Sequence, residues 1–222
     1  MQIQFIVAAC LVTLISVAAA YQYLVHRIDG KCQTKAFFVP AFEKLPFILC
    51  ITTLALAVCT YFYSTLIGQR QFIRALMNAE VLIWLVLLGY IDLREKIIPN
   101  ALILVGLAFW GVLALIDIFV AHTPWLELLK NCLFGGLLVG GLLFLIALIS
   151  KSALGMGDVK MFFVLGLLYG VMDTYALLLF SMVIMAVISL ILLACKKVTT
   201  KTKIPMAPFV TIGFLLSIAA GL

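Results

Sequence analysis

Long apolar stretches alternate with short polar ones along almost the whole chain. The apolar stretches are continuous and do not alternate with polar residues at every second position, a pattern typical of membrane-spanning helices and not of barrel strands. A helix needs about 17–25 apolar residues to cross a bilayer. We therefore expect about eight segments, of which the sixth is too short to cross unaided: 3–25, 46–67, 75–91, 100–120, 131–150, 161–170, 174–195 and 206–222.

The composition supports an all-α fold, a polytopic transmembrane helix bundle. Hydrophobic residues make up 66% of the chain and charged residues only 11%, with a mean hydropathy of +1.30. A soluble domain is closer to half apolar and a quarter charged. The 222 residues fit a single membrane-embedded domain, 1–222, and leave no room for a separate soluble domain.

The basic residues predict how the bundle lies in the lipid bilayer. Of the 15 Lys and Arg residues, 12 fall in four loops: 26–45, 92–99, 151–160 and 196–205. Cytoplasmic loops carry the excess of Lys and Arg, so these loops are predicted to be cytoplasmic and both termini to lie outside. Because the basic residues lie between apolar stretches, the net charge of +6 reflects topology and does not indicate binding to nucleic acid.

Two aspartates stand at the borders of apolar stretches. Asp92 follows the stretch 75–91, and Asp158 precedes the stretch 161–170. A carboxylate near hydrocarbon needs a partner, a proton or water. Two neighbouring carboxylates cannot both ionise easily, so one keeps its proton and the pair offers a general acid and a general base. This is the chemistry of aspartic proteases.

Each aspartate also has a structural interpretation. Asp92 could pair with Arg94 at a helix end, and Asp158 could cap the next helix. Gly155 and Gly157 would allow a sharp turn and the close approach of a substrate strand. The position of both aspartates at one predicted face favours a functional pair.

The segments around both aspartates resemble the type IV prepilin peptidases, which are membrane aspartic proteases of the GxGD type. The resemblance rests on Asp92-Leu93-Arg94 with Ile98-Pro99-Asn100, on Gly155-x-Gly157-Asp158-Val159-Lys160, and more weakly on Ile204-Pro205-x-x-Pro208-Phe209. It implies that Asp92 and Asp158 are catalytic and that Gly155, Gly157 and Lys160 support them. Arg94 is a further candidate, because its charge could steer polar substrate residues.

The resemblance also implies a substrate and a location. The substrates would be prepilins or pseudopilins, cut after a Gly on the cytoplasmic side of a bacterial inner membrane. Many members of the family carry two CxxC pairs in the first cytoplasmic loop, for zinc and for N-methylation of the new N-terminus. Loop 26–45 is reduced to Cys32, with His26 at its edge, whereas a structural zinc site takes four ligands. We expect no metal and no cofactor, and N-methylation stays open.

Two other functions are compatible with the residues. A proton- or cation-coupled transporter could use the two aspartates as ion ligands, although transporters usually place such groups near the midplane in broken helices. A non-enzymatic assembly scaffold would leave the aspartate pair unexplained.

Overall fold

The computed structural model describes residues 72–120, 124–149, 154–196 and 204–220, with Thr199 and Thr202. All regular structure in these residues is helical, as the sequence predicts. The elements are α3 (Phe72–Glu95), α4 (Asn100–Val120), α5 (Trp125–Gly135), the π-helical η2 (Gly136–Gly140), α6 (Gly141–Ile149), α7 (Met156–Ala194) and α8 (Ala207–Ala220). The predicted segments 3–25 and 46–67 and the loop 26–45 lie outside the described residues, so the count of about eight segments stays a prediction.

Among the residues that the structure describes, two helices are long and apolar enough to cross a membrane, Leu129–Ile149 and Met156–Ala194. The first includes η2, so the predicted segment 131–150 starts earlier than expected, and the helix reaches back into the predicted loop 121–130. Asn100–Leu115 and Ala207–Ala220 are shorter apolar helices. These lengths are consistent with a membrane protein.

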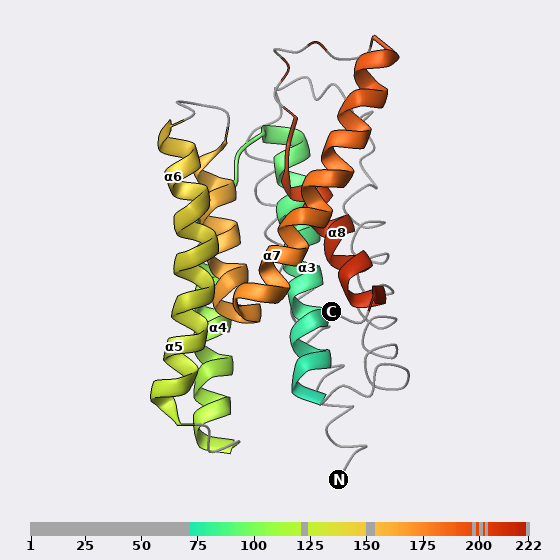
Figure 1. Ribbon diagram of the computed structural model, residues 1–222. Coiled ribbons are helices and arrows are strands. Elements are labelled where there is room, and N and C mark those ends of the chain that lie inside the picture. Colours follow the sequence, from blue (N-terminus) through green and yellow to red (C-terminus); the bar gives the residue numbers. More distant parts are fainter. Residues whose placement is uncertain are drawn as a thin grey trace.

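Helix α7 bends sharply in its middle. Gly170 has φ 75° and ψ −171°, a backbone conformation that only glycine adopts readily. The interruption between the predicted segments 161–170 and 174–195 is therefore a kink within one helix, α7. Across it, the Thr174 hydroxyl donates to the Leu165 carbonyl at 3.1 Å. Figure 1 shows one limb of α7 descending beside α6 and the other rising past α8, so 39 residues fit a bundle shorter than a straight helix of that length.

The two limbs pack on different partners. The first limb packs so closely on α5 that a Cβ on Gly135 or Gly166 would overlap the backbone of the other. The second limb packs on α8, where the Ser181 side chain lies against Gly213. Lipid tails are as apolar as leucine, so helices in a membrane are held by such close van der Waals contact.

Helix α3 contacts α8 and reaches the region of α7 around the kink (Figure 1). Near the kink, Arg74 forms an ion pair with Asp173, and the Tyr169 hydroxyl donates to Asn78 Oδ1 at 2.8 Å. These contacts fix the bend of α7 against the first half of α3.

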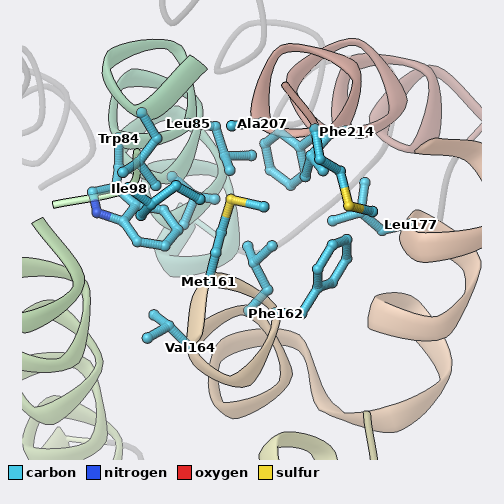
Figure 2. Close-up of a cluster of buried hydrophobic side chains, with 14 of the residues drawn as sticks. Trp84, Leu85, Ile98, Met161, Phe162, Val164, Leu177, Ala207 and Phe214 are labelled. Atoms are coloured by element: carbon cyan, nitrogen blue, oxygen red, sulfur yellow. The ribbon is translucent and has the colours of Figure 1, made fainter. Parts of the chain in front are cut away.

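The buried core lies where α3, α7 and α8 meet (Figure 2). Met161 and Phe162 of α7 have no exposed surface. In the close-up they point toward Leu85 of α3 and Phe214 of α8. The Trp84 indole donates to the Leu102 carbonyl at 2.8 Å and ties α3 to α4. This core fixes the helix ends that carry the two aspartates.

Candidate active site

Asp92 lies in the last turn of α3, where the chain reverses into α4. The Lys96 N–H donates to the Asp92 carbonyl at 2.8 Å, and Lys96 has φ 53°, the left-handed conformation that often ends a helix. Pro99 disfavours helix at the residue before it, and α4 begins at Asn100. The loop 96–99 is therefore short and holds Asp92 at the end of its helix.

The Asp92 side chain is only 5% exposed and is held by the start of α8. The Ala207 N–H donates to Asp92 Oδ2 at 3.1 Å, and the Met206 N–H also faces this carboxylate. Burial raises the pKa of Asp92 above the usual aspartate range, while these N–H groups and the charge of Lys96 act in the opposite direction. The carboxylate therefore sits at the positive end of the α8 dipole.

Helix α8 reaches Asp92 because it packs unusually close to α3. A Cβ on Gly89 would lie 3.2 Å from the Pro208 Cα. One turn away, the Thr211 hydroxyl donates to the Leu85 carbonyl at 3.1 Å. The sequence identified Ile204-Pro205-x-x-Pro208-Phe209 only as a weak family feature, and it gave no sign that Ala207 contacts Asp92.

Asp158 lies in the first turn of α7, so the predicted loop 151–160 ends at residue 155 and the helix begins earlier than expected. Its side chain is partly buried and faces the Gly155 N–H. The N-cap residue of α7 is Gly155, so the interpretation of Asp158 as the N-cap is wrong. The Asp158 carboxylate still stabilises this helix end, because it faces the backbone N–H of the N-cap residue Gly155, as the third helical residue does in a capping box.

The structure gives Gly155 and Gly157 roles other than the predicted sharp turn. Gly155 has φ −72° and ψ 137°, which any residue can adopt, but a Cβ there would lie 2.9 Å from Asp158 Oδ2. A Cβ on Gly157 would lie 2.7 Å from the Ile98 Cβ. Gly155 thus leaves room for the carboxylate, and Gly157 lets α7 rest on the loop that follows Asp92.

These contacts bring the two aspartates together. Their carboxyl groups are near enough for the charge of Asp92 to act on Asp158. A carboxylate pair with one member buried and the other partly accessible can share a proton and polarise a water molecule and a carbonyl group.

The two basic residues singled out from the sequence contact groups other than the two carboxylates. The Arg94 guanidinium lies over the Tyr90 ring, 5.1 Å from its centroid. Arg94 and Asp92 are both among the described residues, and they form no ion pair with each other. The Lys160 amine donates to Asn100 Oδ1 at 2.9 Å. Lys160 therefore ties the first turn of α7 to the first turn of α4.

One comparison with known proteins gives a match. The family described as the type IV leader peptidase family matches residues 79–190, just over half of the chain, and the matched range includes Asp92 and Asp158 but not Ala207. No curated protein and no solved structure gives a significant match.

Proposed function

The chain belongs to the type IV leader peptidase family, and from this premise we propose that it is an aspartic endopeptidase of the membrane that removes the leader peptide of prepilins or pseudopilins. The observation that carries the proposal is the carboxylate pair. Asp92 and Asp158 come from the ends of two helices within the matched range, and their charges interact.

The proposed reaction needs one proton on the pair. The ionised carboxylate takes a proton from a water molecule as the water oxygen attacks the peptide carbonyl carbon. The protonated carboxyl group gives its proton to the carbonyl oxygen. The tetrahedral intermediate then collapses and the C–N bond breaks. The proton taken from water goes to the leaving amine, and a hydroxyl proton of the intermediate returns to the carboxylate that had given its proton. Two coupled groups titrate as a pair, so neither role is assigned to one aspartate alone.

The N–H groups of α8 act as positioning groups in this scheme. The Ala207 N–H holds Asp92 Oδ2, and the Met206 N–H also faces this carboxylate. The general acid and base must be held in productive geometry for this step, and a helix end fixed by Gly89 and Thr211 provides a rigid support.

The proposed site of cleavage is the cytoplasmic border of a bacterial inner membrane, after a Gly of the substrate. The uneven distribution of Lys and Arg among the loops supports this orientation. The transporter alternative is less well supported, because Asp92 lies in the last turn of α3 and Asp158 in the first turn of α7, whereas the coupling sites of transporters lie in the middle of broken helices.

The test is leader removal by the full-length protein in membranes with a co-expressed prepilin. Asp92→Asn and Asp158→Asn should each lower the cleavage rate by at least about 100-fold, the usual contribution of general acid–base catalysis. Asp173→Asn is the matched control, because Asp173 pairs with Arg74 away from the site, and it should cleave normally. Near wild-type cleavage by either of the first two variants would refute the proposal.

A further inference from the structure

A small cavity lies near the kink of α7, well away from the two aspartates. It has a volume of about 10 Å³ and lies between α3, α7 and α8. Its polar lining includes Asn78 of α3, Asp173 of α7 and Ser217 of α8, and apolar side chains such as Leu177 complete it. Asn78 precedes Asp92 by about 20 Å along α3, at 1.5 Å per residue. We call this space the kink cavity.

One polar group of the lining, the Asn78 amide, is incompletely hydrogen-bonded. Its side chain is only 1% exposed, and its Oδ1 accepts a hydrogen bond from the Tyr169 hydroxyl at 2.8 Å. Its Nδ2 has no hydrogen-bond partner among the residues that the structure describes, although buried polar groups nearly always have one. If the amide turned over, Oδ1 would lack a partner instead, so a turn of the amide does not satisfy it.

The size and the lining of the kink cavity fit a water molecule. A cavity can hold one water molecule from a volume of about 10–15 Å³, and a buried water typically makes about three hydrogen bonds. The kink cavity therefore has room for one water molecule and for nothing larger. The water oxygen can accept from Asn78 Nδ2, and its two hydrogens can go to the Asp173 carboxylate and the Ser217 hydroxyl.

A metal ion fits the cavity less well than water does. The group that lacks a partner is an N–H donor, and a cation cannot accept from it. Asp173 is the only charged residue of the lining, and its carboxylate already forms an ion pair with Arg74. Ca²⁺ and Mg²⁺ each take about six or more oxygen ligands, more than this lining offers. The lining therefore favours a neutral ligand that both donates and accepts.

We propose that the kink cavity binds one structural water molecule, which joins Asn78 of α3, Asp173 of α7 and Ser217 of α8. The Arg74–Asp173 ion pair and the Tyr169–Asn78 hydrogen bond already link α3 to α7, and the water adds α8 to this cluster. A buried water that completes the bonding of such groups is costly to remove. The water thus stabilises the kinked form of α7, and this inference does not depend on the proposed function.

The direct test is nuclear magnetic resonance of the full-length protein in lipid nanodiscs, with isotopically labelled asparagine. The chain has three asparagines, Asn78, Asn100 and Asn131, so the side-chain amide signals are few. The Asn78 amide protons should show a nuclear Overhauser cross-peak to water. Absence of this cross-peak in the wild-type protein would overturn the inference.

Three variants exclude other origins of the cross-peak. Tyr169→Phe and Ser217→Ala each remove a hydroxyl proton that could relay the signal, and the cross-peak should remain in both. Ser217→Val fills the cavity with methyl groups and should abolish it. Loss of the cross-peak in either of the first two variants, with the other amide signals unchanged, would overturn the inference. Its persistence in Ser217→Val would also do so, because bulk water would then reach Asn78.

A stability measurement tests the same site independently. Ser217→Val should lower the unfolding temperature by about 4 °C, because Asn78 Nδ2 then loses its partner. With Asn78→Leu present, the same change should lower it by less than half as much, since no unpaired amide is left. Ser189→Val is the matched control, because the Ser189 hydroxyl donates to the Met185 carbonyl within α7, and its effect should be equal in both backgrounds. Equal effects of Ser217→Val in the two backgrounds would contradict a bridging water.

Discussion

At the scale of single residues, the two carboxyl groups occupy unequal surroundings. Asp92 is buried and held by two backbone N–H groups, whereas Asp158 is partly exposed at the start of its helix. Pairs of carboxyl groups in unequal surroundings are how enzymes separate an acid from a base. The pH dependence of cleavage reports on this pair.

Cleavage should depend on pH in a bell shape. At low pH both carboxyl groups are protonated and no base is left, and at high pH both are ionised and no acid is left. Because burial raises the pKa of Asp92 and the two carboxyl groups titrate as a pair, the alkaline limb should lie above the range of a free aspartate. Lys96 lowers this pKa, so Lys96→Gln should move the alkaline limb upward, by less than about one pH unit since Lys96 is exposed.

The measurement is the initial rate of leader removal across the pH range. Lys130→Gln is the control, because Lys130 is an exposed lysine of α5 that does not act on Asp92. A limb that stays in place in Lys96→Gln, or moves to the same extent in Lys130→Gln, would contradict the role given to Lys96.

Gly155 provides a second prediction at this scale. In Gly155→Ala the new Cβ would lie 2.9 Å from Asp158 Oδ2, so the carboxylate must rotate while the helix stays in place. Misplacement of a catalytic group by about 1 Å can cost about 100-fold in rate, and we expect a loss of cleavage between about tenfold and 100-fold with an unchanged unfolding temperature. Cleavage within twofold of wild type would show that the position of Asp158 tolerates the methyl group.

At the scale of elements, the site is made where three helix ends meet. The C-terminus of α3 supplies Asp92, the N-terminus of α7 supplies Asp158, and the N-terminus of α8 supplies the N–H groups that hold Asp92. Two positive helix ends therefore face a pair of carboxyl groups, and this favours retention of negative charge there. The contact between α7 and the loop 96–99 decides how close the two carboxyl groups lie.

That contact is tested at Gly157. A Cβ there would lie 2.7 Å from the Ile98 Cβ. Both Cβ atoms are attached directly to the backbone and cannot rotate away, so in Gly157→Ala the start of α7 must move away from the loop 96–99. Overpacking of this kind costs about 1–3 kcal/mol. Gly157→Ala should therefore lower both the cleavage rate and the unfolding temperature, in contrast to Gly155→Ala, and Gly111→Ala should lower neither. Loss of cleavage without loss of stability would assign Gly157 to substrate contact instead.

At the scale of the whole molecule, the helix ends that carry the site gather at one end of the bundle. Figure 1 shows the end of α3 and both ends of α7 on the upper side of the view, while α4 and α5 are joined at the lower side. The first three ends adjoin the predicted cytoplasmic loops 92–99, 151–160 and 196–205. The kink at Gly170 makes this arrangement possible, because it returns α7 to the side from which it began.

The orientation in the membrane is predicted from the charges and can be measured with a membrane-impermeant maleimide on intact cells. In a chain with Cys195 as the only cysteine, the exposed thiol at the end of α7 should be protected until the cells are opened. With Cys195→Ser and Pro124→Cys, the thiol lies in the predicted outer loop 121–130 and should be labelled on intact cells. The reverse pattern would place the carboxylate pair outside and end the proposal of cytoplasmic cleavage.

The sequence alone determined the features that depend on neighbouring residues. Continuous apolar stretches define helices, and α4, for example, matches the predicted segment 100–120. The interruption between the predicted segments 161–170 and 174–195 coincides with the bend at Gly170. The aspartates at two segment borders, with their flanking motifs, indicated the leader peptidase family.

Only the tertiary structure decided the contacts between distant segments. Asp92 and Ala207 are 115 residues apart, and no local pattern indicates that an N–H group of α8 holds the carboxylate. The roles of Gly155 and Gly157 likewise depend on what lies beyond their missing Cβ atoms, an oxygen of Asp158 and the side chain of Ile98. Apolar periodicity specifies which segments are helices, whereas close packing of side chains against one another specifies which surfaces meet.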